Sequence, residues 1–109
     1  MSITLDLVRA GAYCTLHFLG VEARCPARTF YDSLQPVDQK RSKVAFRQIS
    51  DWAQGHRRVQ VRFIGFWDGP RDFVITNGFF KHRSSETRRE IETALRLQAM
   101  YLEDKEDAT

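Results

Sequence analysis

The spacing of apolar residues changes three times along the chain, and the order of these changes limits the folds available to it. Apolar and polar residues alternate over residues 3–7 and again over residues 13–19, which is typical of half-buried strands. The pair Ala10-Gly11 supplies a turn between the two segments, and Gly20 follows the second one. The first twenty residues therefore predict a β-hairpin.

Helical spacing then replaces the alternation. Pro26 suits the first position of a short helix, and Pro36 interrupts that helix. A longer helix is predicted from about residue 36 to residue 54, where Gly55 ends it. We expect these two helices to lie antiparallel, joined at the proline. The apolar face of the longer helix would hold Val37, Val44, Ile49 and Trp52.

Strand character returns over residues 58–67 and 72–80, which are rich in β-branched and aromatic residues. The triplet Asp68-Gly69-Pro70 predicts a turn between them. Arg62 would point away from the apolar side of the first strand, because side chains alternate along a strand. One face of the second strand would hold Phe73, Ile75, Asn77 and Phe79.

A final helix is predicted to begin near Ser84-Ser85. The order strand–strand–helix–helix–strand–strand–helix predicts a compact α+β fold with an antiparallel sheet. We expect one domain over residues 1–109, with an acidic tail from about residue 103 that frays. The apolar stripe of the final helix would hold Ile91, Ala94, Leu95, Gln98 and Leu102.

The composition indicates where in the cell the protein works and whether it binds a metal or cofactor. No apolar run reaches the roughly 18 residues that span a bilayer, and the N-terminus lacks the apolar core of a signal peptide, so we expect a cytoplasmic protein. Cys14 and Cys25 are too few for a disulfide framework or a four-ligand zinc site. His17 completes no metal-ligand spacing with them, and the sequence has no Gly-rich phosphate loop, so we expect no metal and no cofactor.

Charge is distributed unevenly along the chain. Residues 40–89 carry twelve Lys and Arg against four Asp and Glu, a net charge of +8. Residues 1–39 have a net charge of −1, and residues 90–109 a net charge of −4. The middle segment is therefore a candidate surface for binding a polyanion such as nucleic acid.

The stretch FVITNGFFKHRSSETRREIETA, residues 73–94, joins an apolar strand, a Gly-Phe pair and a short basic run to a Ser-rich turn and an acidic-apolar helix. This order resembles the last strand and last helix of RelE/ParE superfamily toxins, especially the phage-derived HigB-like branch of type II toxin–antitoxin systems. Residues 30–34 and 39–52 resemble the helical hairpin of that family. The resemblance implies a RelE-like fold: a small antiparallel sheet, an N-terminal helical hairpin and a C-terminal helix.

The resemblance also implies an activity, the metal-independent endoribonucleolytic cleavage of mRNA on the ribosome. Such a toxin inhibits translation and arrests growth, and a cognate antitoxin protein neutralises it. Arg62 matches the strand arginine of the family, and its planar guanidinium suits the phosphate of the transition state. His82 is the predicted acid–base group. Lys81 and Arg83 flank it as further catalytic cations.

The other basic residues of the middle segment are predicted to bind RNA outside the catalytic site. Lys40, Lys43 and Arg47 form a basic helix face suited to ribosomal RNA, although the same pattern also fits a plain solvated surface. Flanking phosphates and one stacked base would be held by His56, Arg57, Arg58, Trp67 and Arg71.

Departures from the family pattern keep a second hypothesis open. The family's Tyr-Arg-x-x-Tyr strand appears here as residues 61–66 with both Tyr positions altered, and the two adjacent lysines that usually follow Gly-Phe appear as Lys81-His82. The alternative is a non-catalytic binding protein on the same fold, either a ParE-like gyrase poison or a phage-encoded docking protein.

Overall fold

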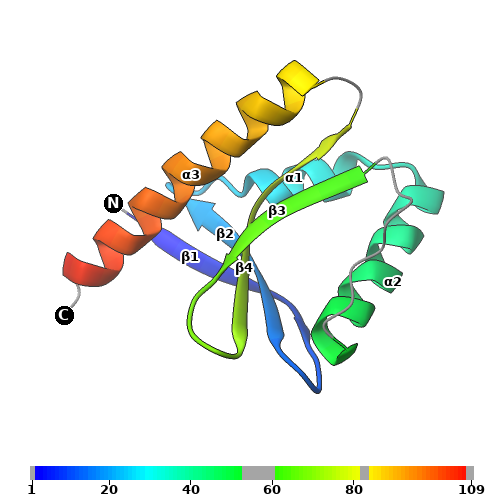
Figure 1. Ribbon diagram of the computed structural model, residues 1–109, viewed down its shortest axis with the longest axis horizontal. Helices are drawn as coiled ribbons and strands as arrows, with labels where there is room; N and C mark the ends of the chain where they lie inside the picture. Colours follow the sequence, from blue (N-terminus) through cyan, green and yellow to red (C-terminus); the bar gives the residue numbers. More distant parts are fainter. Residues whose placement is uncertain (1, 53–60, 82–83, 108–109) are drawn as a thin grey trace.

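The computed structural model describes residues 2–52, 61–81 and 84–107. Strands and helices follow one another in the predicted order, so the α+β class is confirmed (Figure 1). The elements are β1 (Ile3–Ala10), β2 (Thr15–Val21), α1 (Pro26–Ser33), α2 (Pro36–Trp52), β3 (Val61–Trp67), β4 (Asp72–Phe80) and α3 (Ser84–Asp107).

The sheet is mixed, with strand order β1-β2-β4-β3. The β1–β2 and β3–β4 pairs are antiparallel, but β2 and β4 run parallel, with Thr15 opposite Asp72 and Phe18 opposite Ile75. The prediction of an antiparallel sheet is therefore wrong at its centre. The chain forms α1, α2 and β3 between the two central strands, and a connection of that length permits parallel pairing.

The helices also differ from the predicted arrangement. Both β1 and β2 precede them, so the N-terminal element is a strand hairpin rather than a helical hairpin. Figure 1 shows α2 turning away from α1 after the short connection at Leu34, so the two helices diverge instead of lying side by side.

Two apolar clusters fill opposite faces of the sheet. Leu16 and Phe18 of β2 point toward α1 and α2, where they meet Phe46. Leu19 of the same strand points the other way and packs against Leu97 of α3. The alternation of side chains along β2 therefore places the sheet between one helical layer made of α1 and α2 and another made of α3.

The buried faces of α2 and α3 are rotated from those predicted. In α3 the buried residues are Ala94, Leu97 and Tyr101, whereas the predicted stripe members Ile91, Leu95 and Leu102 are exposed. In α2 the buried apolar residue is Phe46; Ile49 packs against the same cluster as predicted, while Val37 is 55% exposed. Both helices carry apolar residues on more than one side, so their own spacing does not decide which side faces the sheet.

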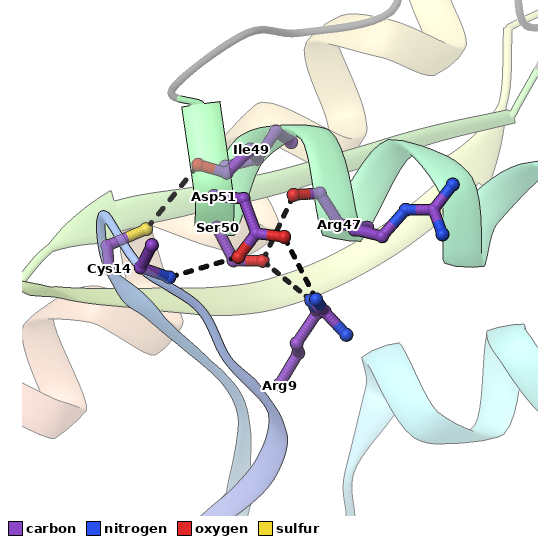
Figure 2. Close-up of polar contacts among 7 residues, drawn as sticks. Arg9, Cys14, Arg47, Ile49, Ser50 and Asp51 are labelled. Carbon is purple, nitrogen blue, oxygen red and sulfur yellow. Dashed lines mark hydrogen bonds and ion pairs between the residues drawn. The ribbon is translucent and has the colours of Figure 1, made fainter.

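The end of α2 is anchored to the turn between β1 and β2 (Figure 2). Asp51 accepts hydrogen bonds from Arg9 Nη2 at 2.9 Å and from the backbone N–H of Ala12 at 3.0 Å. The carbonyl of Ser50 accepts two further backbone N–H groups from the same turn. Gly11 permits this approach, because a Cβ there would lie 2.5 Å from the carbonyl carbon of Ser50.

None of the helices in the described ranges is long and apolar enough to cross a membrane. The cytoplasmic location stays a prediction.

Candidate nucleic-acid interface

Arg62 and Lys81 lie at the same end of two neighbouring strands. Val61 of β3 pairs with Phe80 of β4, and Arg62 pairs with Phe79. Lys81 is exposed, and Arg62 is half-buried with its Nη1 donating to the carbonyl of Val61 at 3.3 Å. Lys81 directly follows the last paired residue of β4, and diagonal neighbours on paired strands are about 8 Å apart, a span that these two long side chains can bridge. Both cations can therefore reach one phosphate group.

A β-bulge in β4 decides which face of the sheet each residue occupies. The pairing of β3 with β4 skips Thr76, so the alternation of side chains reverses there. Ile75 packs in the cluster beneath α1 and α2, whereas Asn77 Nδ2 donates to the side chain of Glu90 on α3 at 2.8 Å. The prediction that Ile75, Asn77 and Phe79 share a face with Phe73 is therefore wrong beyond the bulge.

Alternation of side chains places the Cβ of Arg62 on the α3 side of the sheet. Gly78 faces α1, because a Cβ at this position would lie 2.4 Å from the ring of Phe30. Its neighbour Phe79 consequently points toward α3, and Arg62 shares that face as the cross-strand partner of Phe79. At the β3 edge of the sheet, however, Arg62 also lines a pocket together with Arg41 and Phe46 of α2.

Several predicted site residues lie outside the described residues. His82 and Arg83 of the catalytic set are among them, and their roles stay predictions. The same holds for the RNA-binding residues His56, Arg57 and Arg58.

The third histidine, His17, is engaged elsewhere. Its Nε2 lies 2.9 Å from Asp72 Oδ1, across the parallel pairing of β2 with β4. His17 is half-buried in the sheet, well away from the end that carries Arg62.

The basic face of α2 is separate from Arg62. Lys40, Lys43 and Arg47 are all exposed, and their spacing of three and four residues places them along one side of the helix. None of these three residues lines the pocket that Arg62 shares with α2, where the cation from the helix is Arg41.

Trp67 and Arg71, two further residues predicted to bind RNA, lie at the turn between β3 and β4. Trp67 is five residues from Arg62 along β3, which corresponds to about 17 Å. The residue is 49% exposed, and its ring contacts Tyr13 and Phe73 edge-on, with centroid distances of 6.2 and 5.1 Å. Arg71 is exposed beside it. The predicted basic residues that the structure describes thus lie at three places: the exposed face of α2, the end of the sheet with Arg62 and Lys81, and the β3–β4 turn.

One basic cleft escaped the sequence analysis. It lies between β1, α1 and α2, has a volume of about 340 Å³, and is lined by Arg9, Arg28 and Lys43. We call it the β1–α1–α2 cleft. Sequence reasoning missed it because Arg9 and Arg28 belong to the segment with a net charge of −1, and a segment total does not show which side its cations face.

The groups that could bind metal or act as nucleophiles are few. Within the described ranges, no three His, Cys, Asp or Glu side chains are placed to hold a metal ion. Cys14 and Cys25 are both free thiols. Burial raises the pKa of each thiol, so neither is a reactive thiolate at neutral pH.

Comparison of the chain with protein-family models, with curated protein sequences and with solved structures found no match.

Proposed function

We propose that the protein is the toxin of a type II toxin–antitoxin system, with a RelE-like fold and metal-independent, ribosome-dependent mRNA endoribonuclease activity. The observation that carries the proposal is the pairing of β3 with β4, which brings Arg62 and Lys81 to one end of the sheet. The sequence resemblance over the last strand and helix supports it, as does the order of elements from β2 onward.

The proposed reaction needs three functions at one phosphodiester. The ribose 2′-oxygen attacks phosphorus and loses its proton to a base, and a 2′,3′-cyclic phosphate forms. The bond from phosphorus to the 5′-oxygen breaks, and an acid protonates the leaving oxygen. Arg62 and Lys81 neutralise the additional negative charge on the phosphoryl oxygens, and Arg83 supplements them. His82 is one of the two proton-transfer groups, either the base at the 2′-oxygen or the acid at the 5′-oxygen.

The partners follow from the same proposal. Lys40, Lys43 and Arg47 on α2 contact ribosomal RNA, while mRNA enters at the end of the sheet that carries Arg62. The cognate antitoxin neutralises the toxin by covering the cations at that end with acidic or apolar segments.

Cleavage on programmed ribosomes tests the proposal. Purified protein is incubated with ribosomes carrying a defined mRNA, and primer extension locates new 5′ ends. Arg62→Ala and His82→Ala should each lower the cleavage rate by about a hundredfold or more, because each removes a group that acts in the transition state. Arg96→Ala is the matched control, since it removes one exposed arginine from the outer side of α3 and should cleave at the wild-type rate.

The alternative is a docking protein without catalysis, and the distribution of cations over three places favours it. In that case wild-type protein arrests growth while mRNA stays intact, and Arg62→Ala retains the toxicity. A gyrase poison would in addition induce DNA-damage signalling. Either result would contradict the nuclease proposal.

A further inference from the structure

The β1–α1–α2 cleft collects cations from three separate elements. Arg9 comes from the edge strand β1, Arg28 from the first turn of α1, and Lys43 from the middle of α2. These residues are far apart in sequence, and the fold alone brings them to one opening. An arrangement of this kind favours a ligand with concentrated negative charge.

The acidic partners of these cations neutralise them only in part. Arg9 pairs with Asp51 at 2.9 Å, and Arg28 Nη2 lies 3.4 Å from an oxygen of Asp6. Asp6 is 61% exposed, so this second pair is weak. Lys43 has no ion pair with any other described residue. Three cations against two carboxylates leave the cleft positive.

Arg28 is held in place before any ligand arrives. Its guanidinium carbon lies 4.9 Å from the centroid of the Phe18 ring, and the ring is fully buried beneath it. This cation–π contact restricts the side chain while leaving 39% of it exposed. A guanidinium positioned in this way binds two oxygens of a phosphate with little further loss of conformational freedom.

The wall of the cleft suits a ligand that also has an apolar part. The cations stand over a surface formed by Leu7, Val8, Phe18, Tyr31 and Phe46. A volume of about 340 Å³ falls in the range of pockets that accept small organic ligands.

We propose that the β1–α1–α2 cleft binds a phosphate group carried by a nucleotide or by an RNA strand. Arg28 and Lys43 contact the phosphate oxygens directly, and Arg9 adds positive charge from the far side while it stays paired with Asp51. Lys43 is also one of the α2 cations proposed to contact ribosomal RNA, but Arg62 does not line this cleft, so the two proposals can be tested separately.

An NMR titration of ¹⁵N-labelled protein with AMP tests the proposal. Amide signals of residues 7–9, 28–31 and 43–46 should shift together and saturate. Arg28→Gln and Lys43→Gln should each weaken AMP binding by about tenfold or more, because each removes a charge-assisted contact. The matched control Arg96→Gln removes the same charge from α3 and should bind AMP as the wild type does. Equal weakening in Arg28→Gln and Arg96→Gln would overturn the proposal.

Adenosine and a short single-stranded RNA complete the test. Adenosine lacks the phosphate and should leave the cleft signals unshifted, and binding of adenosine as tight as that of AMP would contradict the assignment. RNA that shifts the same signals, and loses this effect in Arg28→Gln, identifies an RNA strand as the ligand. AMP binding without RNA binding identifies a free nucleotide. Arg62→Ala should leave all cleft shifts intact, so failure of the nuclease proposal and failure of this one are distinguishable.

Discussion

Two tyrosine hydroxyls differ in whether they have a hydrogen-bond partner. The hydroxyl of Tyr31 is buried and has no hydrogen-bond partner among the described residues, whereas that of Tyr101 donates to Asp68. A buried polar group without a partner costs free energy, and a hydrogen bond to a carboxylate stabilises. The same chemical change should therefore have opposite effects at the two positions.

Tyr31→Phe should leave the free energy of unfolding unchanged or raise it by up to about 1 kcal/mol, because no hydrogen bond is lost. Tyr101→Phe should lower it by about 2 kcal/mol, because Asp68 loses a donor in a partly buried site. Urea denaturation of both variants measures the difference. A loss in Tyr31→Phe as large as that in Tyr101→Phe would show that the Tyr31 hydroxyl is satisfied.

Asp68 should also make stability depend on pH. Hydrogen bonds from Lys105 and Tyr101 hold the pKa of its carboxyl below the ordinary value of 3.8. Because the folded pKa is the lower one, this stabilisation is present above pH 3.8 and is lost as the pH falls through the folded pKa. Asp68→Asn should flatten the acid limb of a plot of unfolding free energy against pH. An unchanged acid limb would contradict the assignment.

Tyr101 should act at the other end of the pH scale. Burial, followed by the hydrogen bond to Asp68, raises the pKa of its hydroxyl from 10.0 to about 12. A raised folded pKa means that the stabilisation is complete below pH 10.0 and is lost as the pH rises toward 12. Tyr101→Phe should remove this alkaline loss, which unfolding measured at increasing pH would detect.

At the scale of elements, the sequence predicted the type and order of every helix and strand because periodicity and turn residues are local signals. It did not predict the bulge at Thr76, because nothing in residues 72–80 marks which residue will stay unpaired. One extra residue moved Asn77 and Phe79 to the α3 side. The faces of α2 and α3 were likewise decided by packing against the sheet rather than by their own spacing.

The contact between α2 and the β1–β2 turn should depend on Gly11. Gly11→Ala places a Cβ 2.5 Å from the backbone of Ser50, so the end of α2 must move away at a cost of about 2 kcal/mol. Hydrogen exchange should accelerate at the amides of Tyr13 and Cys14, which donate to the carbonyl of Ser50.

Gly69→Ala is the control for that variant. Gly69 has a φ of +85° and no atom within 4 Å of a built Cβ, so the substitution adds only local backbone strain. It should leave exchange at Tyr13 and Cys14 unchanged. Equal acceleration in both variants would show that the Gly11 contact does not anchor α2.

At the scale of the whole molecule, the candidate site was only partly predictable. The sequence identified Arg62 and Lys81, and the pairing of β3 with β4 brings them together. The mixed sheet could not be anticipated, because parallel pairing of β2 with β4 depends on the path of the whole chain. The cleft of Arg9, Arg28 and Lys43 was missed for the same reason, since three distant segments form it.

The central claim is that Arg62 and Lys81 act on one phosphodiester of mRNA. Sequencing of RNA with 5′-hydroxyl ends from cells that express the protein tests it most directly. We predict new 5′-hydroxyl ends within translated regions for the wild type and for Arg96→Ala, and their absence for Arg62→Ala. Growth arrest with intact transcripts, or equal cleavage by wild type and Arg62→Ala, would contradict the account.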